Sequence, residues 1–167
     1  MTGPGLLSAT PAESISEDDV ALDVTVRAEV DLDRARAAFA DLSWLGRPTD
    51  EAAARGERTI AADLELPVLD GSGPSVRKAA IIEIGDVLQT RRGLSVPISW
   101  RSASMTPLFP VFAGRLEIRS SGLTLVGRYA PPFGKMGMLI DRALLHFVAT
   151  RSASALLATV VHHCQRW

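Results

Sequence analysis

The sequence has little cysteine, lysine and tyrosine, and it has no asparagine at all. Its single cysteine, Cys164, excludes an intrachain disulfide, and the lack of asparagine excludes an N-glycosylation sequon. No apolar run approaches the ~20 residues that a membrane-spanning helix needs, and residues 1–19 lack the basic start and apolar core of a secretory signal. We therefore expect a soluble, cytoplasmic protein without stable membrane insertion.

Net charge is also nearly absent, although charged residues are common. Eighteen basic and nineteen acidic side chains leave a net charge of −1, and both signs are scattered along the chain. A protein that binds nucleic acid normally gathers its basic residues on one face. The sequence therefore predicts no nucleic-acid partner.

The best-marked catalytic and metal-binding motifs are missing. The stretch "GSGPSVRK" (71–78) lacks the spacing of a phosphate-binding loop, and no G-x-S-x-G, H-E-x-x-H or C-x-x-C occurs. "HHC" at 162–164 contains metal-ligand residue types, but adjacent residues on a helix point about 100° apart. No metal-site spacing surrounds them. The sequence predicts no metal and no cofactor, and it leaves the catalytic residues unknown.

The 167 residues fit one domain. Residues 1–19, rich in Gly, Pro, Ser and acid, are expected to form a flexible N-terminal tail, followed by a single domain over 20–167.

Residues 20–30 alternate between apolar and polar, which predicts a half-buried strand. Asp31 or Asp33 can N-cap a short helix after it, and "SWLGRP" (43–48) resembles a second helical turn. Residues 49–57 are either a further helical turn or a loop.

After Gly56 the alternation returns and short turns separate the segments, which predicts an antiparallel meander. Pro97 lacks an N–H donor and suggests an edge strand or a bulge. The expected strands cover 59–66, 76–89, 94–104, 111–120 and 123–130.

The last segment, about 135–165, reads as a helix of roughly 45 Å. Ser152, Thr159 and His163 project away from its apolar arc, but Phe147 and its neighbours add apolar surface on another side. Such a helix needs cover from a sheet and from a further layer, such as a ligand, a loop or a partner. The apolar arc consists of Leu139, Ala143, Ala153, Leu157, Val160 and Val161.

This order of elements, over about 20–165, resembles the helix-grip fold of the START-like superfamily, also called SRPBCC or Bet v 1-like. The segment "FPVFAGRLEIRSSGLTLVGRYAPPFGKMGMLIDRALLHFVATRSASALLA" (109–158) looks like the closing strands and helix of uncharacterised bacterial members. The resemblance implies an α+β fold. In it, a curved antiparallel sheet of about six or seven strands surrounds a long C-terminal helix, with two short helices after the first strand.

The superfamily includes lipid-binding domains and polyketide cyclases. The resemblance therefore implies binding or carriage of an apolar small molecule, a lipid or a polycyclic aromatic, in a cavity between sheet and helix. The alternative is a cyclase or aromatase-type enzyme acting in the same pocket, with His146, Arg142 and Tyr129 as candidate groups. A third interpretation makes the surplus apolar face of the helix a homodimer seam.

His146 projects into the apolar arc of the last helix, with Arg142 one turn before it and Thr150 one turn after. These three either face a pocket or form a solvent-facing row; the second interpretation is favoured because the opposite side of the helix is also apolar. The only tyrosine, Tyr129, carries a hydroxyl that could reach a ligand. The predicted ligand-binding residues are Ile82, Ile98, Trp100, Phe112, Tyr129, Phe133, Arg142, His146 and Thr150.

Overall fold

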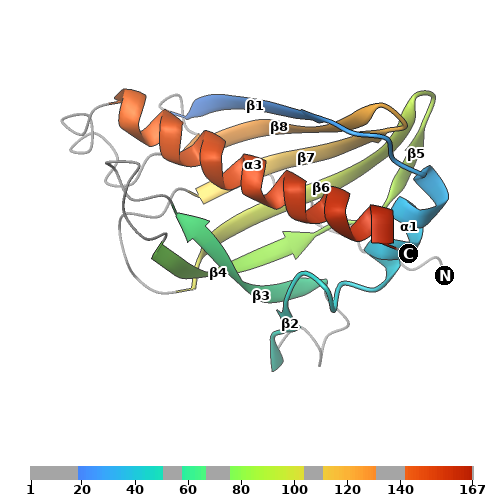
Figure 1. Cartoon of the computed structure of the whole chain (residues 1–167). Coiled ribbons are helices and arrows are strands. Elements are labelled where there is room, and N and C mark those ends of the chain that lie inside the picture. Colours follow the sequence, from blue (N-terminus) through green and yellow to red (C-terminus); the bar gives the residue numbers. More distant parts are fainter. Residues whose placement is uncertain (1–18, 51–57, 67–75, 104–110, 131–141, 167) are drawn as a thin grey trace, which may run out of the picture.

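One long helix lies against a curved, open antiparallel sheet of eight strands (Figure 1). The structure is a computed structural model, and it describes residues 19–50, 58–66, 76–103, 111–130 and 142–166. The strands are β1 (Val20–Arg27), β2 (Arg47–Pro48), β3 (Thr59–Leu66), β4 (Val76–Ile84), β5 (Leu88–Thr90), β6 (Gly93–Ser102), β7 (Val111–Arg119) and β8 (Gly122–Ala130). The helices are α1 (Leu32–Ala40) and α3 (Arg142–Arg166).

The predicted α+β class and the antiparallel strand pairing are confirmed. The strand order is β1-β8-β7-β6-β4-β3-β2, and β5 pairs with β6 beside this path. Every pairing is antiparallel. The sheet has eight strands rather than the expected six or seven. The difference comes from β2 and β5, two short strands that the sequence pattern did not separate.

The second helical turn predicted at 43–48 is wrong. A turn, closed by a bond from Leu45 N to Leu42 O (3.0 Å), leads instead into β2, which pairs with β3. Gly46 shows why, since a Cβ there would lie 2.4 Å from the carbonyl oxygen of Ala61. The backbone approaches β3 so closely that only glycine fits. Residues 51–57, where a helical turn or a loop was expected, lie outside the described residues.

The strand predicted over 76–89 is divided into β4 and β5. The break falls at Gly85, whose N–H donates to the carbonyl oxygen of Pro97 (2.8 Å). A Cβ at Gly85 would come within 2.9 Å of the Pro97 ring. Proline has no N–H to return to the ladder, so the pairing is interrupted at the place where Pro97 predicted an edge or a bulge.

The short helix predicted after residue 31 and the long last helix both form in the described residues. Asp31 caps α1, because its Oδ1 accepts hydrogen bonds from the N–H groups of Asp33 (2.9 Å) and Arg34 (3.0 Å). The predicted start of the last helix, 135–141, lies outside the described residues, as do residues 1–18 of the expected tail. Neither α1 nor the described part of α3 offers a stretch that is long and apolar enough to cross a bilayer.

The side of α3 that faces the sheet includes one residue that the sequence pattern placed elsewhere. Ser152 was predicted on the polar side, yet it is only 5% exposed. The prediction failed because it followed residue type, whereas burial follows position on the helix. The buried residues of α3 are Ala149, Ser152, Ala153, Leu156, Leu157, Val160 and Cys164.

Candidate functional site

A row of large side chains crosses the inner face of the sheet, the face that lies against α3. Its members are direct cross-strand partners from β3 to β1. The rings of Trp100 and Phe112 stack within it, with centroids 4.1 Å apart. The aromatic row consists of Ile60, Ile82, Trp100, Phe112, Tyr129 and Val20, of which all but Val20 are buried.

Two glycines beside the aromatic row make room for one of its rings. Gly114 on β7 and Gly127 on β8 are direct partners. A Cβ at Gly114 or Gly127 would lie 2.7 or 2.6 Å from Cζ of Phe112. The ring of Phe112 therefore extends over the bare backbone of the two glycines. Sequence reasoning missed this pair, although glycine within a strand, in phase with inward residues, signals a close approach.

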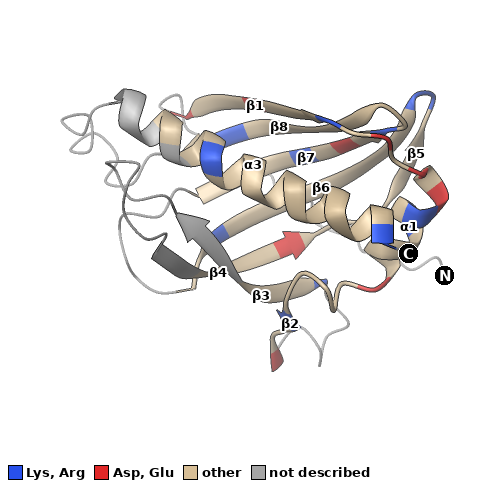
Figure 2. Cartoon of the chain, in the orientation of Figure 1, with Lys and Arg blue, Asp and Glu red and all other residues tan. Residues whose placement is uncertain are grey.

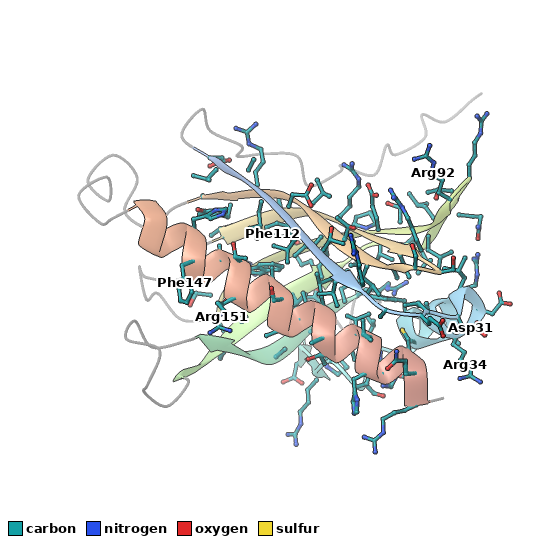
Figure 3. The ribbon with its side chains drawn as sticks, turned by 45° about the horizontal axis from the view of Figure 1, so that its top comes forward. Asp31, Arg34, Arg92, Phe112, Phe147 and Arg151 are labelled. Atoms are coloured by element: carbon teal, nitrogen blue, oxygen red, sulfur yellow. The ribbon has the colours of Figure 1, made fainter. Side chains whose placement is uncertain are left out.

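The helix α3 spans the middle of the sheet. Its close backbone neighbours are β1 and β8 toward one end of the strand order, β3 toward the other end, and α1. The central strands β4, β6 and β7 lie further from the α3 backbone. Figure 3 shows Phe112 on the sheet beside the half of α3 that carries Phe147. Figure 1 shows α3 running across the face of the curved sheet and ending beside α1.

Two hydroxyl groups on α3 are enclosed without a hydrogen-bond partner in the described part of the chain. They are Oγ1 of Thr150 and Oγ of Ser152. Other α3 hydroxyls are satisfied within the helix, since Ser154 donates to the Thr150 carbonyl (2.8 Å) and Thr159 to that of Ala155 (3.0 Å). Buried polar groups are nearly always paired, and an unpaired one costs about 1–3 kcal/mol. The two hydroxyls are thus sites where an additional hydrogen-bonding group would be favourable.

His146 lies where the cover on the inner side of α3 ends. It precedes Ala149 by three residues and Ala153 by seven, so all three project to the same helix face. Ala149 and Ala153 are buried, yet His146 is exposed. His146 therefore lies on the face that is buried further along the helix and is itself open to solvent, and the interpretation that it faces a pocket stays a prediction. Phe147, next to it, is 42% exposed, with the Arg151 guanidinium 5.5 Å from its ring centroid.

The structure brings together most of the predicted ligand-binding residues. Ile82, Ile98, Trp100, Phe112 and Tyr129 are all buried on the inner face. Thr150 lies on α3 with its hydroxyl enclosed, and His146 is exposed. Arg142 is the first residue of α3, but its side chain lies outside the described residues, as does all of Phe133.

The other half of α3 packs tightly against α1 and the turn that follows it. Trp44 stacks on His163 (4.5 Å between centroids), meets Phe39 edge to face (5.9 Å), and donates its indole N–H to the Ala38 carbonyl (2.8 Å). Burial raises the pKa of the Cys164 thiol above its usual range. Hydrogen bonds from Ser43, and then the nearby His163, lower the pKa of Asp41.

Two surface hollows are also formed by described residues. One, of about 310 Å³, is lined by residues of β6, β7 and the turn before β6, and the other, of about 430 Å³, by residues 40–42, 48 and 58–60. Neither is lined by a described residue of α3. In the described ranges, no three His, Cys, Asp or Glu side chains lie close enough together to hold a metal ion.

Fold and site together define an α+β protein in which one long helix covers the aromatic inner face of an antiparallel sheet. Comparison with family models, with curated proteins and with solved structures finds no match to the chain.

Proposed function

We propose that this chain binds an apolar small molecule between the sheet and the first half of α3, in the manner of a START-like helix-grip protein. The observation that carries the proposal is the change in cover along one helix face. Ala149 and Ala153 are buried on that face, and His146, on the same face, is exposed. The ligand would enter beside His146 and lie over the aromatic row.

The aromatic row supplies the apolar contact surface that such a ligand needs. Trp100, Phe112 and Tyr129 come from three adjacent strands and form one surface beneath α3. An aromatic side chain offers about 150–250 Å² for contact, and burial of apolar surface contributes about 25 cal/mol per Å². A flat polycyclic molecule or an acyl chain fits a surface of this composition.

An unsatisfied hydroxyl supplies a polar contact that orients a ligand. Thr150 lies one turn after His146 on α3, and its hydroxyl oxygen is enclosed. Ser152, two residues further, projects about 200° away around the helix, so it does not face the same ligand. A ligand with one hydroxyl or carbonyl group would remove the cost of leaving the Thr150 hydroxyl unpaired. Mostly apolar sites with a few polar groups are typical of small-molecule pockets.

The geometry supports binding ahead of cyclase or aromatase catalysis. The catalytic alternative needs His146 and Tyr129 to act on one enclosed molecule. Tyr129 is 1% exposed within the sheet, whereas His146 is open to solvent. A His146 side chain that is open to solvent favours a place at the entrance of the site over proton transfer inside it.

The test compares Thr150→Val with the matched control Thr159→Val. The probes are 1-naphthol and 1-methylnaphthalene, which differ by one polar group and are titrated by fluorescence and calorimetry. We expect saturable binding of both probes to the natural chain. Thr150→Val should weaken naphthol binding roughly fivefold, since one hydrogen bond contributes about 1 kcal/mol, and should leave methylnaphthalene unchanged. Thr159, whose hydroxyl already bonds to Ala155, should affect neither.

The same variant has a second, independent readout. Without ligand, Thr150→Val removes an unpaired buried hydroxyl and should stabilise the chain by about 1 kcal/mol in urea unfolding. Native mass spectrometry of the freshly purified protein should also detect a retained small molecule. Failure of the natural chain to bind either probe up to the solubility limit would overturn the proposal. A retained molecule that is strongly polar would also do so.

A further inference from the structure

The outer face of the sheet, turned away from α3, carries a hollow with a different chemistry. Its volume is about 310 Å³, and it lies between the β5–β6 turn and β7. Ser95 of β6, a small residue, pairs with Glu117 of β7 and leaves space above the sheet. Gly93, with φ of +147°, starts β6 so close to β7 that a Cβ would lie 2.0 Å from the Ile118 carbonyl oxygen. The lining residues are Thr90, Arg91, Arg92, Leu94, Ser95, Arg115, Glu117, Ile118 and Arg119.

This hollow is strongly basic, although the whole chain has a net charge of −1. Four arginines and one glutamate line it, which leaves a net charge of +3. Figure 2 shows the basic positions at the turn beside β5 and along β7. The hollow therefore concentrates positive charge that the overall composition conceals.

Glu117 holds two of the guanidinium groups in place. Its Oε1 accepts from Nε of Arg115 (3.0 Å), and its Oε2 accepts from Nη2 of Arg119 (2.9 Å). One carboxylate shared between two guanidinium groups leaves most of their donors available. The two ion pairs therefore hold the side chains of Arg115 and Arg119 in place, and the hollow keeps a net positive charge.

The two turn arginines supply the remaining charge. Among the described residues, Arg91 and Arg92 form no ion pair and both are exposed. The Ser95 hydroxyl likewise has no hydrogen-bond partner in the described part of the chain. Arginine forks bind phosphate oxygens with two parallel hydrogen bonds. We propose that this hollow binds the phosphoryl groups of a phosphorylated small molecule or of a lipid headgroup.

Inorganic pyrophosphate is the probe for the shared chemistry, titrated by calorimetry into the full-length chain at constant ionic strength. We expect saturable binding by the natural chain. The double variant Arg91→Gln/Arg92→Gln should weaken it roughly tenfold. The matched control, Arg101→Gln/Arg128→Gln, removes the same charge from exposed positions on the same face outside the hollow and should stay near the natural affinity.

Glu117→Gln should change the affinity for pyrophosphate in the opposite direction. Its carboxylate competes with the anion for Arg115 and Arg119, so its neutralisation should strengthen pyrophosphate binding roughly threefold. Equal losses in both arginine double variants would mean that only overall charge matters, and this would overturn the proposal. Absence of saturable binding by the natural chain would also overturn it.

Vesicles distinguish the two sources of phosphate. Sedimentation with phosphatidylcholine vesicles, with and without phosphatidic acid, tests for a lipid headgroup. Binding that requires phosphatidic acid, is displaced by pyrophosphate and is lost in Arg91→Gln/Arg92→Gln supports a lipid headgroup. Pyrophosphate binding without vesicle binding supports a soluble phosphorylated molecule.

Discussion

The two ends of α3 pack against the rest of the molecule in different ways. At the α1 end, Leu157, Val160 and Cys164 are buried, and the Trp44–His163 stack closes the contact. At the His146 end, the same helix face is exposed at His146, and the enclosed Thr150 hydroxyl lies one turn further on. The comparison suggests that the α1 end maintains the fold and that the His146 end is available for a ligand.

Neighbouring elements explain this difference. The α1 end is covered by α1, which contacts β6, β7 and α3, and its cap and indole hydrogen bond leave those polar groups satisfied. At the His146 end α1 gives no such cover, and the sheet that α3 faces carries large rings over the bare backbone of the glycine pair. A fully packed core tolerates little change, whereas a binding site needs surface that a ligand can cover.

The largest expected effect comes from Leu157→Ala at the α1 end. Leu157 is 0% exposed, and such truncations leave cavities that cost about 3 kcal/mol. Urea unfolding measures the loss, and Thr159→Ala, on the exposed side of the same helix, is the control. Probe binding per folded molecule should not change. A loss below about 1 kcal/mol, or a large change in naphthol affinity, would contradict the division between the two ends.

A somewhat smaller loss is expected from Gly127→Ala at the His146 end. The new Cβ would lie 2.6 Å from Cζ of Phe112 and 2.4 Å from the Ala113 carbonyl oxygen. Displacing the ring and the strand should cost about 2 kcal/mol of unfolding free energy.

A double-mutant cycle shows whether the ring is responsible for the loss. Combined with Phe112→Leu, the effect of Gly127→Ala should be smaller than in the natural chain, because the two residues contact each other. Strict additivity would mean that Phe112 does not occupy the space over Gly127.

The smallest expected effect concerns the pH dependence of the α1 end. Hydrogen bonding from the Arg34 N–H is the main cause that lowers the pKa of Asp31 below its usual 3.8. The ionised carboxylate therefore stabilises the fold at neutral pH, and this contribution is lost as the pH falls through the lowered pKa. Asp31→Asn keeps an acceptor that does not titrate.

Thermal unfolding of both chains, from neutral pH to below that pKa, tests this assignment. The difference in Tm between the natural chain and Asp31→Asn should be largest at neutral pH and should shrink in acid. A difference that does not vary with pH would show that the charge of Asp31 contributes nothing to the cap.

Much of the sheet could be predicted because strand alternation is a local signal. The strands predicted over 20–30, 59–66 and 123–130 form as β1, β3 and β8, although β1 already ends at Arg27 and β8 begins at Gly122. The extra strands could not be predicted in this way, because each is delimited by a close backbone contact with another strand. Gly46 allows β2 only because β3 lies against it, and Gly85 breaks the strand only because Pro97 lies opposite.

The strand residues of the candidate site could be predicted from the same local alternation. Alternation places Ile82, Trp100 and Phe112 on one face, and the structure buries all three there. The glycine pair and Ser152 were not predicted as part of it. Their roles depend on a ring from a neighbouring strand and on the sheet opposite α3, and no pattern within one segment records either.

The sequence by itself determined which side of each strand and helix is apolar, because periodicity is a property of neighbouring residues along the chain. Only the tertiary structure decided what covers each side. His146 and Ala153 project to the same helix face, yet one is exposed and the other buried. Four arginines separated along the chain by up to 28 positions likewise meet in one hollow. Both outcomes depend on which elements the fold brings opposite one another, and burial and local charge arise only from that meeting.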